Sequence, residues 1–181
     1  MMLSVLRPRW RLLSEEAVKP SIERQLGLYV LRSLRDEDVE QARVLRNGAR
    51  HTFWSAEEIS EEQQKSWYAA YLARSDDLMF VAVRGGEVVG TVGLQHYGAE
   101  PVEFGRLVVA DSERRRGLGL AMSSAAVAIA FERGAKHVVL TVRQDNVPAR
   151  VLYARLGFRE VGRDDGLVRM SLGAPTTEEV T

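Results

Sequence analysis

The segment Arg114-Arg115-Arg116-Gly117-Leu118-Gly119 joins a β-branched apolar run to a long alanine-rich stretch. The run Leu107-Val108-Val109 predicts a strand before it, and the alanine-rich stretch predicts a helix after it. The first amides of a helix have no intrahelical partners and lie at the positive end of the helix dipole. Because glycine lets an anion approach the backbone closely, we expect this turn to bind a phosphate-bearing ligand.

The remaining periodicity gives the order β-α-α-β-β-β-α-β-α-β-β, which predicts an α/β domain with a mixed sheet. The expected strands cover residues 28–31, 78–83, 88–94, 102–109, 137–142, 158–161 and 167–172. The expected helices begin at Asp36, Ser60, Gly117 and Asn146. Ser60 with Gln63 resembles a capping box, and Gly85-Gly86 predicts a hairpin turn.

Length and composition indicate one globular domain, since 181 residues suffice for a substantial core. Residues 1–26 lack clear periodicity, so we expect an N-terminal extension there, either packed on the domain or flexible. The domain is expected at 27–173, followed by a polar tail at 174–181. Lys+Arg and Asp+Glu both total 25, which gives no general reason to expect nucleic acid or an anionic membrane as a partner.

Several chemistries are excluded by residue usage. The absence of cysteine excludes disulfides, thiolate catalysis and cysteine-ligated metals. The histidines, His51, His96 and His137, lack metal-ligand spacing, so no metal is expected. No apolar run approaches the ~18 residues that span a bilayer. The N-terminus lacks a signal-peptide pattern, and a cytoplasmic location is therefore expected.

Two motifs resemble those of the GCN5-related N-acetyltransferase (GNAT) superfamily. Its signature Gln/Arg-x-x-Gly-x-Gly/Ala occurs as Arg114-x-x-Gly117-x-Gly119, and its second motif as Asn146, Tyr153 and Gly157-Phe158. Short glycine patterns recur by chance, but two motifs in the right order and strand-loop-helix setting form a specific signal. The resemblance covers residues 28–172. It implies an α/β (α+β) GNAT fold, with a mixed, mostly antiparallel sheet of about six to seven strands, about four helices and one splayed strand pair.

The resemblance implies acetyl-CoA as the co-substrate and no metal. The pyrophosphate is expected on the amides of residues 115–119, and the pantetheine arm along the strand edge through Leu107 and Val109. Arg114 holds the motif position, whereas Arg115 and Arg116 need supply only amides. The expected contacts are Leu107, Val108, Val109, Arg114, Arg115, Arg116, Gly117, Leu118, Gly119, Asn146 and Tyr153. Helix capping is the alternative role of Asn146.

The implied activity is acyl-CoA-dependent N-acetyl transfer to a primary amine within a ternary complex. Tyr153 matches the tyrosine that protonates the departing sulfur, and a packed aromatic is its alternative role. Glu103, six residues before Val109, is the predicted base; its alternative is an ordinary strand-face carboxylate. His96 competes with Glu103, and a water relay is a third route. The N–H group of Val109 is the expected oxyanion donor.

The acceptor site is expected in residues 46–67 and around His96, with Arg46, Asn47, Trp54 and His96 as contacts. The aromatic loop and Gln64-x-x-Trp67 resemble a subgroup that acts on nucleotide-linked amino sugars and shades into enzymes acetylating ribosomal and other protein N-termini. A small-molecule amine, such as a nucleotide amino sugar, is therefore the leading acceptor. A protein or peptide N-terminus is the second hypothesis and would be favoured by a more acidic cleft. A non-catalytic acyl-CoA-binding module is the third, and a homodimer is compatible with the resemblance.

Overall fold

The computed structural model describes residues 19–53 and 55–175, which form one eight-stranded sheet in the order β1-β2-β3-β4-β5-β6-β8-β7. The strands are β1 (Glu23–Leu26), β2 (Tyr29–Ser33), β3 (Leu78–Arg84), β4 (Glu87–Gln95), β5 (Val102–Val109), β6 (His137–Arg143), β7 (Arg159–Asp164) and β8 (Leu167–Gly173). The α-helices of the described residues are α1 (Val39–Gly48), α2 (Glu61–Leu72), α3 (Leu118–Glu132) and α4 (Val147–Arg155). Short 3-10 turns occur at Asp36–Asp38, Arg50–Thr52 and Asp111–Glu113. The mixed sheet with four helices confirms the predicted fold class.

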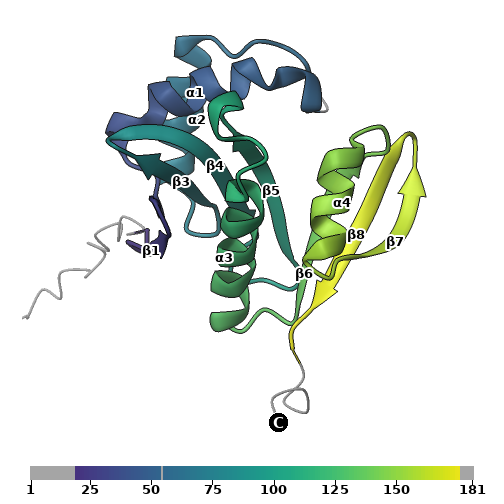
Figure 1. The fold of residues 1–181 in the computed structure, drawn as a ribbon. Helices are drawn as coiled ribbons and strands as arrows, with labels where there is room; N and C mark the ends of the chain where they lie inside the picture. The colour runs from purple at the N-terminus through teal and green to yellow at the C-terminus, as the bar shows by residue number, and fades with distance from the viewer. Residues whose placement is uncertain (1–18, 54, 176–181) are drawn as a thin grey trace, which may run out of the picture.

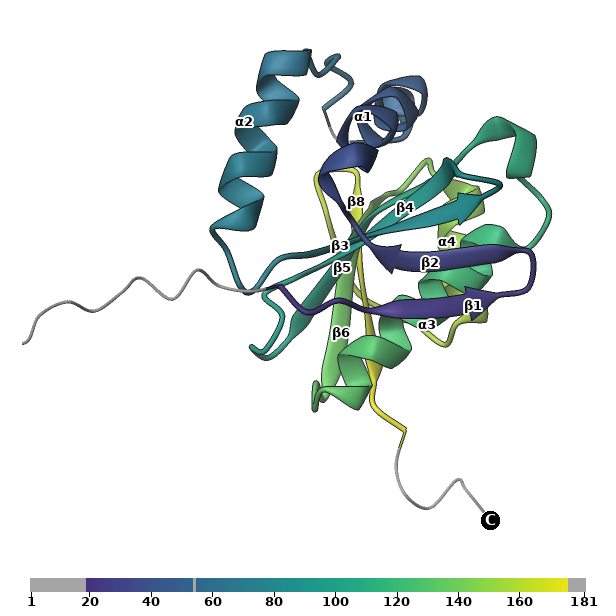
Figure 2. The same ribbon diagram turned by 90° about the vertical axis from the view of Figure 1, so that its left-hand side faces the viewer.

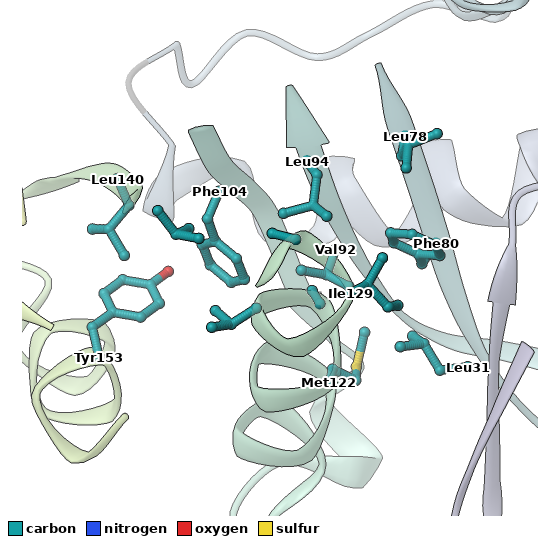
Figure 3. Close-up of a cluster of buried hydrophobic side chains, with 14 of the residues drawn as sticks. Leu31, Leu78, Phe80, Val92, Leu94, Phe104, Met122, Ile129, Leu140 and Tyr153 are labelled. Carbon is teal, nitrogen blue, oxygen red and sulfur yellow. The ribbon is translucent and has the colours of Figure 1, made fainter. Parts of the chain in front are cut away.

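Helices cover both faces of the sheet (Figure 2). Side chains alternate along each strand, so Phe80 and Leu94 reach the α3 face, where Met122 and Ile129 of that helix complete the main core (Figure 3). On the opposite face, Tyr71 and other side chains of α1, α2, β3 and β4 form a smaller cluster. This second face carries the α1–α2 loop and one of the two cavities described below.

β5 and β6 are the one parallel pair in the described sheet, and α3 makes the crossover between them. They pair only at Val102–Val138 and Glu103–Val139, and then diverge (Figure 1). The rest of β5 therefore has a free edge on its β6 side. This confirms the predicted splayed pair and provides room for a ligand alongside β5.

A β-bulge interrupts β5. Thr91 on β4 pairs with Val108, but Gly93 pairs with Gly105, so β5 holds one extra residue in between. Arg106 lies in the bulge with φ +55°, a conformation that non-glycine residues rarely adopt. Its guanidinium forms two hydrogen bonds, of 2.5 and 3.0 Å, with the buried carboxylate of Asp77. This long-range pair offsets the local strain and anchors the bulge.

The last four residues of the predicted N-terminal extension, 1–26, form β1. It pairs antiparallel with β2 over four residue pairs, from Glu23–Arg32 to Leu26–Tyr29. β1 is an edge strand whose side chains are mostly exposed, so it carries no apolar alternation that sequence inspection could detect. Residues 1–18 and the end of the predicted tail, 176–181, lie outside the described part.

The predicted local turns are confirmed. Gly85 and Gly86 have φ values of +58° and +88°. Ser60 and Gln63 form the reciprocal hydrogen bonds of a capping box, in which the Gln63 N–H group lies 3.2 Å from the Ser60 hydroxyl. These features depend on a few neighbouring residues, which explains why the sequence reveals them.

Candidate active site

The loop before α3 leaves the start of that helix uncapped. Gly117 occupies the N-cap with φ +83°, and no side chain forms a capping hydrogen bond. The first amides of α3 therefore have no acceptor from a capping side chain. The preceding turn is fastened by Glu113, whose buried carboxylate accepts hydrogen bonds from the Tyr29 hydroxyl (2.6 Å) and from Arg84 (2.8 Å). These two hydrogen bonds, that from Tyr29 first, lower the pKa of Glu113.

A groove of about 840 Å³ opens between β5 and α4 and extends to the start of α3. It brings together many of the predicted cofactor contacts: Leu107, Val108, Val109, Arg114, Arg115, Gly119 and Asn146. Arg116, Gly117, Leu118 and Tyr153 do not line it, and Leu118 is buried in the core. His51, Thr52, Arg143 and Asp145 also line the groove, although the sequence analysis assigned them no role there. Only the placement of Arg143 and Asp145 just before the second motif offered a signal for them.

The backbone of Val109 faces this groove. The N–H group of Ala110 donates to the carbonyl of Val89 on β4 at 2.9 Å. Because successive N–H groups of a strand point to opposite sides, the N–H and C=O groups of Val109 point away from β4. Arg114 Nε reaches the Val109 carbonyl from the groove side, at 3.4 Å. An extended ligand can thus pair with this edge and place an anionic group at the start of α3.

Gly119 brings the start of α3 close to both walls of the groove. A Cβ atom at this position would lie 3.3 Å from Leu152 Cδ1 of α4 and 3.5 Å from Val109 Cγ2 of β5. Asn146 caps α4, because its side-chain oxygen accepts a hydrogen bond from the Ala149 N–H group at 3.2 Å. The capping role proposed for Asn146 is therefore present, on a residue that also lines the groove.

Tyr153 extends from α4 toward Phe104 on β5, with its hydroxyl end on the β5 side (Figure 3). Its ring packs edge-on against Phe104 and Phe158, with centroid distances of 5.7 and 6.0 Å. Burial raises the pKa of Tyr153 to about 12, so the phenol stays protonated at neutral pH. The residue has both the packing of a core aromatic and the proton required of an acid.

A second cavity, of about 440 Å³, lies on the α1–α2 face of the sheet. Apolar and aromatic side chains form much of its wall: Ala42, Phe53, Ile59, Trp67, Met79 and Val108. Polar residues complete it: Arg46, Ser55, Glu57, Glu58, Gln63, Gln64, Thr91 and Arg106. Val108 lines both this cavity and the groove, so both spaces border β5 beside the bulge.

Two of the predicted acceptor contacts support the α1–α2 loop. Arg46 lines the cavity, and its guanidinium donates to the carbonyls of Glu57 (2.5 Å) and Ser55 (2.9 Å). Burial lowers the pKa of Arg46. Asn47 exchanges two hydrogen bonds with the backbone of Ile59, at 2.9 and 3.0 Å, and does not line the cavity. Their contact with a substrate stays a prediction, and Trp54 lies outside the described residues.

The structure brings the two predicted bases together. His96 Nε2 lies 3.7 Å from Glu103 Oε2, and His96 Nδ1 lies 3.9 Å from Asp76 Oδ2. Glu103 pairs with Gln95 across β4–β5. His96 and Glu103 line neither the groove nor the second cavity, and both side chains are solvent-accessible. Their catalytic role stays a prediction, for which a water relay is the compatible route.

Other types of site find no support in the described residues. Within residues 19–53 and 55–175, no three histidine, aspartate or glutamate side chains are grouped so that they could hold a metal ion. Over the same ranges, no helix has the length and apolar character to cross a membrane.

Comparison with known proteins agrees with this geometry. Residues 40–158 match the sequence model of the acetyltransferase (GNAT) family. An N-alpha-acetyltransferase from Sulfurisphaera tokodaii is 31% identical over 145 residues, covering 74% of this chain and 81% of that protein. A mycothiol acetyltransferase from Saccharomonospora viridis is 29% identical over 166 residues, covering 83% of this chain but 51% of that protein. The chain spans only about a third to a half of the mycothiol acetyltransferases that it matches.

Solved structures share the fold. The spermidine N-acetyltransferase from Vibrio cholerae, in complex with CoA and spermine, has a TM-score of 0.71 at 21% identity, covering 82% of this chain and 96% of that one. The ribosomal-protein-alanine N-acetyltransferase from Brucella melitensis has a TM-score of 0.68 at 20% identity, covering 80% and 99%. At these sequence identities, the similarity shows a shared fold and nothing further.

Proposed function

The chain belongs to the acetyltransferase (GNAT) family, and we propose that it is an enzyme that transfers the acetyl group of acetyl-CoA to a primary amine. The observation that carries this proposal is that the groove and the second cavity are both bordered by Val108. The groove offers a free strand edge and an uncapped helix start, and the second cavity offers a site for a second reactant. The CoA found with the Vibrio cholerae protein of the same fold supports acetyl-CoA as the ligand of the groove.

In the proposed complex, the groove holds the co-substrate at two places. The pyrophosphate binds the first amides of α3, with Arg114 and Arg115 supplying positive charge. The pantetheine arm pairs with the N–H and C=O groups of Val109, as an added strand would. This arrangement directs the thioester toward Val108 and the second cavity.

The acetyl transfer then needs three protein contributions. The neutral amine nitrogen attacks the thioester carbon, forming a C–N bond, and the Val109 N–H group stabilises the oxyanion that develops. The C–S bond breaks, and Tyr153 gives its proton to the departing sulfur. Glu103 or His96, directly or through water, takes the proton that the amine loses.

For the acceptor, the sequence predicts a small-molecule amine such as a nucleotide-linked amino sugar. The cations of the second cavity are already engaged, because Arg46 binds two carbonyls and Arg106 binds Asp77. Glu57 and Glu58 form no ion pair with any described residue. Two arginines and two glutamates line the cavity, so their formal charges balance. A small-molecule amine and a peptide or protein N-terminus are both kept as candidate acceptors, and the substrate panel below distinguishes them.

Two measurements test the proposed activity. Calorimetry with acetyl-CoA tests binding in the groove, and CoA-thiol release measures turnover against nucleotide amino sugars, free amino sugars, small amines and short peptides. Turnover of any of these amines supports the enzyme. Acetyl-CoA binding without turnover across the panel would favour the non-catalytic binding module, and absence of both would refute the proposal.

A further inference from the structure

The turn that follows α1 borders both spaces of the proposed site. Ala49, His51 and Thr52 line the groove, and the next residue, Phe53, lines the second cavity. On the sheet, Val108 likewise borders both spaces. Because the amine and the thioester of the proposed ternary complex come from these two spaces, we expect the turn and Val108 to flank the reacting atoms.

We propose that His51 is the general base that takes the proton lost by the acceptor amine. This inference rests on the proposed acetyl transfer and assigns the proton transfer that the sequence left open between Glu103, His96 and water. Imidazole is the side-chain group whose ordinary titration range lies nearest neutral pH, where a general base works best. His51 is the one histidine of the described residues that lines the groove or the second cavity.

Hydrogen bonds hold the backbone of this turn in place. The N–H group of Thr52 donates to the Ala49 carbonyl at 2.9 Å, and that of Phe53 donates to the Arg50 carbonyl at 3.1 Å. The Thr52 hydroxyl donates to the same Ala49 carbonyl at 2.8 Å. His51 is thus presented by a fixed 3-10 turn, and its exposure to solvent gives the proton a route out of the site.

The carboxylates that line the groove are engaged in ion pairs. The charged residues that line the groove together with His51 are Asp111, Arg114, Arg115, Arg143 and Asp145. Asp111 lies 3.0 Å from Arg114, and Asp145 lies 2.5 Å from Arg143. The hydrogen bond from Arg143 lowers the pKa of Asp145, which makes this carboxylate a weaker base. Neither carboxylate is therefore suited to take a proton at neutral pH.

The other candidate bases line one space or neither. Glu57 and Glu58 line the second cavity alone, and carboxyl groups ordinarily titrate well below neutral pH. Glu103 and His96 line neither space, so each would act through water. His51 instead lies in the turn that borders both.

The proposed step uses His51 and Tyr153 as separate base and acid. The amine nitrogen attacks the thioester carbon and forms the C–N bond, and its N–H bond breaks as a nitrogen of the neutral imidazole takes the proton. The imidazolium then releases this proton to solvent. Tyr153 supplies a different proton to the sulfur as the C–S bond breaks.

His51→Asn tests this role, because asparagine stays polar but cannot take a proton near neutral pH. With the best amine of the substrate panel, we expect kcat to fall about 10²- to 10⁴-fold, while calorimetry gives the wild-type Kd for acetyl-CoA. His137→Asn is the matched control, since His137 is also exposed but lines neither space. Its kcat should equal that of the wild type.

The pH dependence distinguishes a base from a structural residue. The ionisation of the amine affects both proteins alike, so it cancels in the ratio of the wild-type kcat/KM to that of His51→Asn. We expect this ratio to be constant at neutral and alkaline pH and to fall toward one as acid protonates the wild-type imidazole. A structural role alone would give a ratio that does not change with pH, and that result would overturn the assignment.

Glu103→Gln and His96→Asn separate the alternatives. If either variant loses turnover while His51→Asn behaves as the wild type does, the base belongs to that pair, and the inference is overturned while the acetyltransferase stands. If the wild type turns over no amine, the proposed enzyme is itself refuted, and this inference falls with it.

Discussion

Adding one methyl group at Gly119 should weaken the binding of acetyl-CoA while leaving the stability of the protein nearly unchanged. Gly119 lies in the first turn of α3, where alanine is a better helix former than glycine by about 1 kcal/mol. The new Cβ would lie 3.3 Å from Leu152 Cδ1, so the flexible leucine must move by a few tenths of an ångström. The gain and the crowding are opposed, and we expect the free energy of unfolding to stay within about 1 kcal/mol of the wild type.

The same methyl group should be costly for the ligand. It would lie between Val109 and Leu152, where the proposed binding mode brings a phosphate to the helix amides. Loss of one hydrogen bond to a charged group costs about 1.5–3 kcal/mol, which corresponds to a Kd raised about 10- to 100-fold. Urea unfolding and calorimetric titration with acetyl-CoA measure the two quantities on Gly119→Ala.

Gly48→Ala is the matched control, because it adds the same methyl group at the end of α1 with no heavy atom within 4 Å of the new Cβ. Its Kd should equal that of the wild type. If Gly119→Ala bound acetyl-CoA as tightly as the control, the phosphates would not lie at the start of α3. If it unfolded far more easily than the control, the crowding against Leu152 would be greater than the geometry indicates.

Three further changes probe other parts of the molecule. Tyr153→Phe removes only the hydroxyl, so single-turnover kinetics should show a loss of about 10²- to 10⁴-fold with an unchanged Kd for acetyl-CoA, and an unchanged rate would exclude the phenol as the acid. Asp77→Ala leaves Arg106 without its buried partner and should lower the free energy of unfolding by about 3–5 kcal/mol in urea; a loss below about 1 kcal/mol would contradict the anchoring of the bulge. The Tyr29 hydrogen bond lowers the folded-state pKa of Glu113, so its stabilisation is present above the ordinary value of about 4.3 and is lost as the pH falls through the folded pKa. Thermal melts should therefore show a smaller acid-induced loss of stability for Glu113→Gln than for the wild type, and parallel pH profiles would refute this account.

The features that the sequence revealed are those determined by a few neighbouring residues. The capping box at Ser60 and the hairpin turn at Gly85-Gly86 follow from local hydrogen bonding and from the tolerance of glycine for positive φ. The groove could be predicted because its motif residues occupy the loops that follow β5 and β6. β1 escaped prediction because an edge strand with exposed side chains has no buried periodicity.

The second cavity could not be predicted at the same level, because the partners of its charged side chains are distant in the sequence. In the sequence, Arg46 and Arg106 are simply two cations near an expected substrate site. In the structure, Arg106 pairs with Asp77, which is 29 residues away, and Arg46 donates to two carbonyls of the α1–α2 loop. These partners fix the direction of both guanidinium groups, and the sequence alone does not identify them.

The bulge at Arg106 determines which residues of β5 border the groove and the second cavity. Before it, Glu103 and Gly105 face the α1–α2 side of the sheet, opposite Gln95 and Gly93; after it, Val108 does so, opposite Thr91. The inserted residue thus changes which positions of β5 face each side, as a one-residue shift of register does. Without it, the residues from Leu107 onward would exchange faces, and Val108, which borders both the groove and the second cavity, would turn toward α3. The ion pair between Arg106 and Asp77 therefore helps to hold Val108 in this position, although neither of its residues belongs to the family motifs.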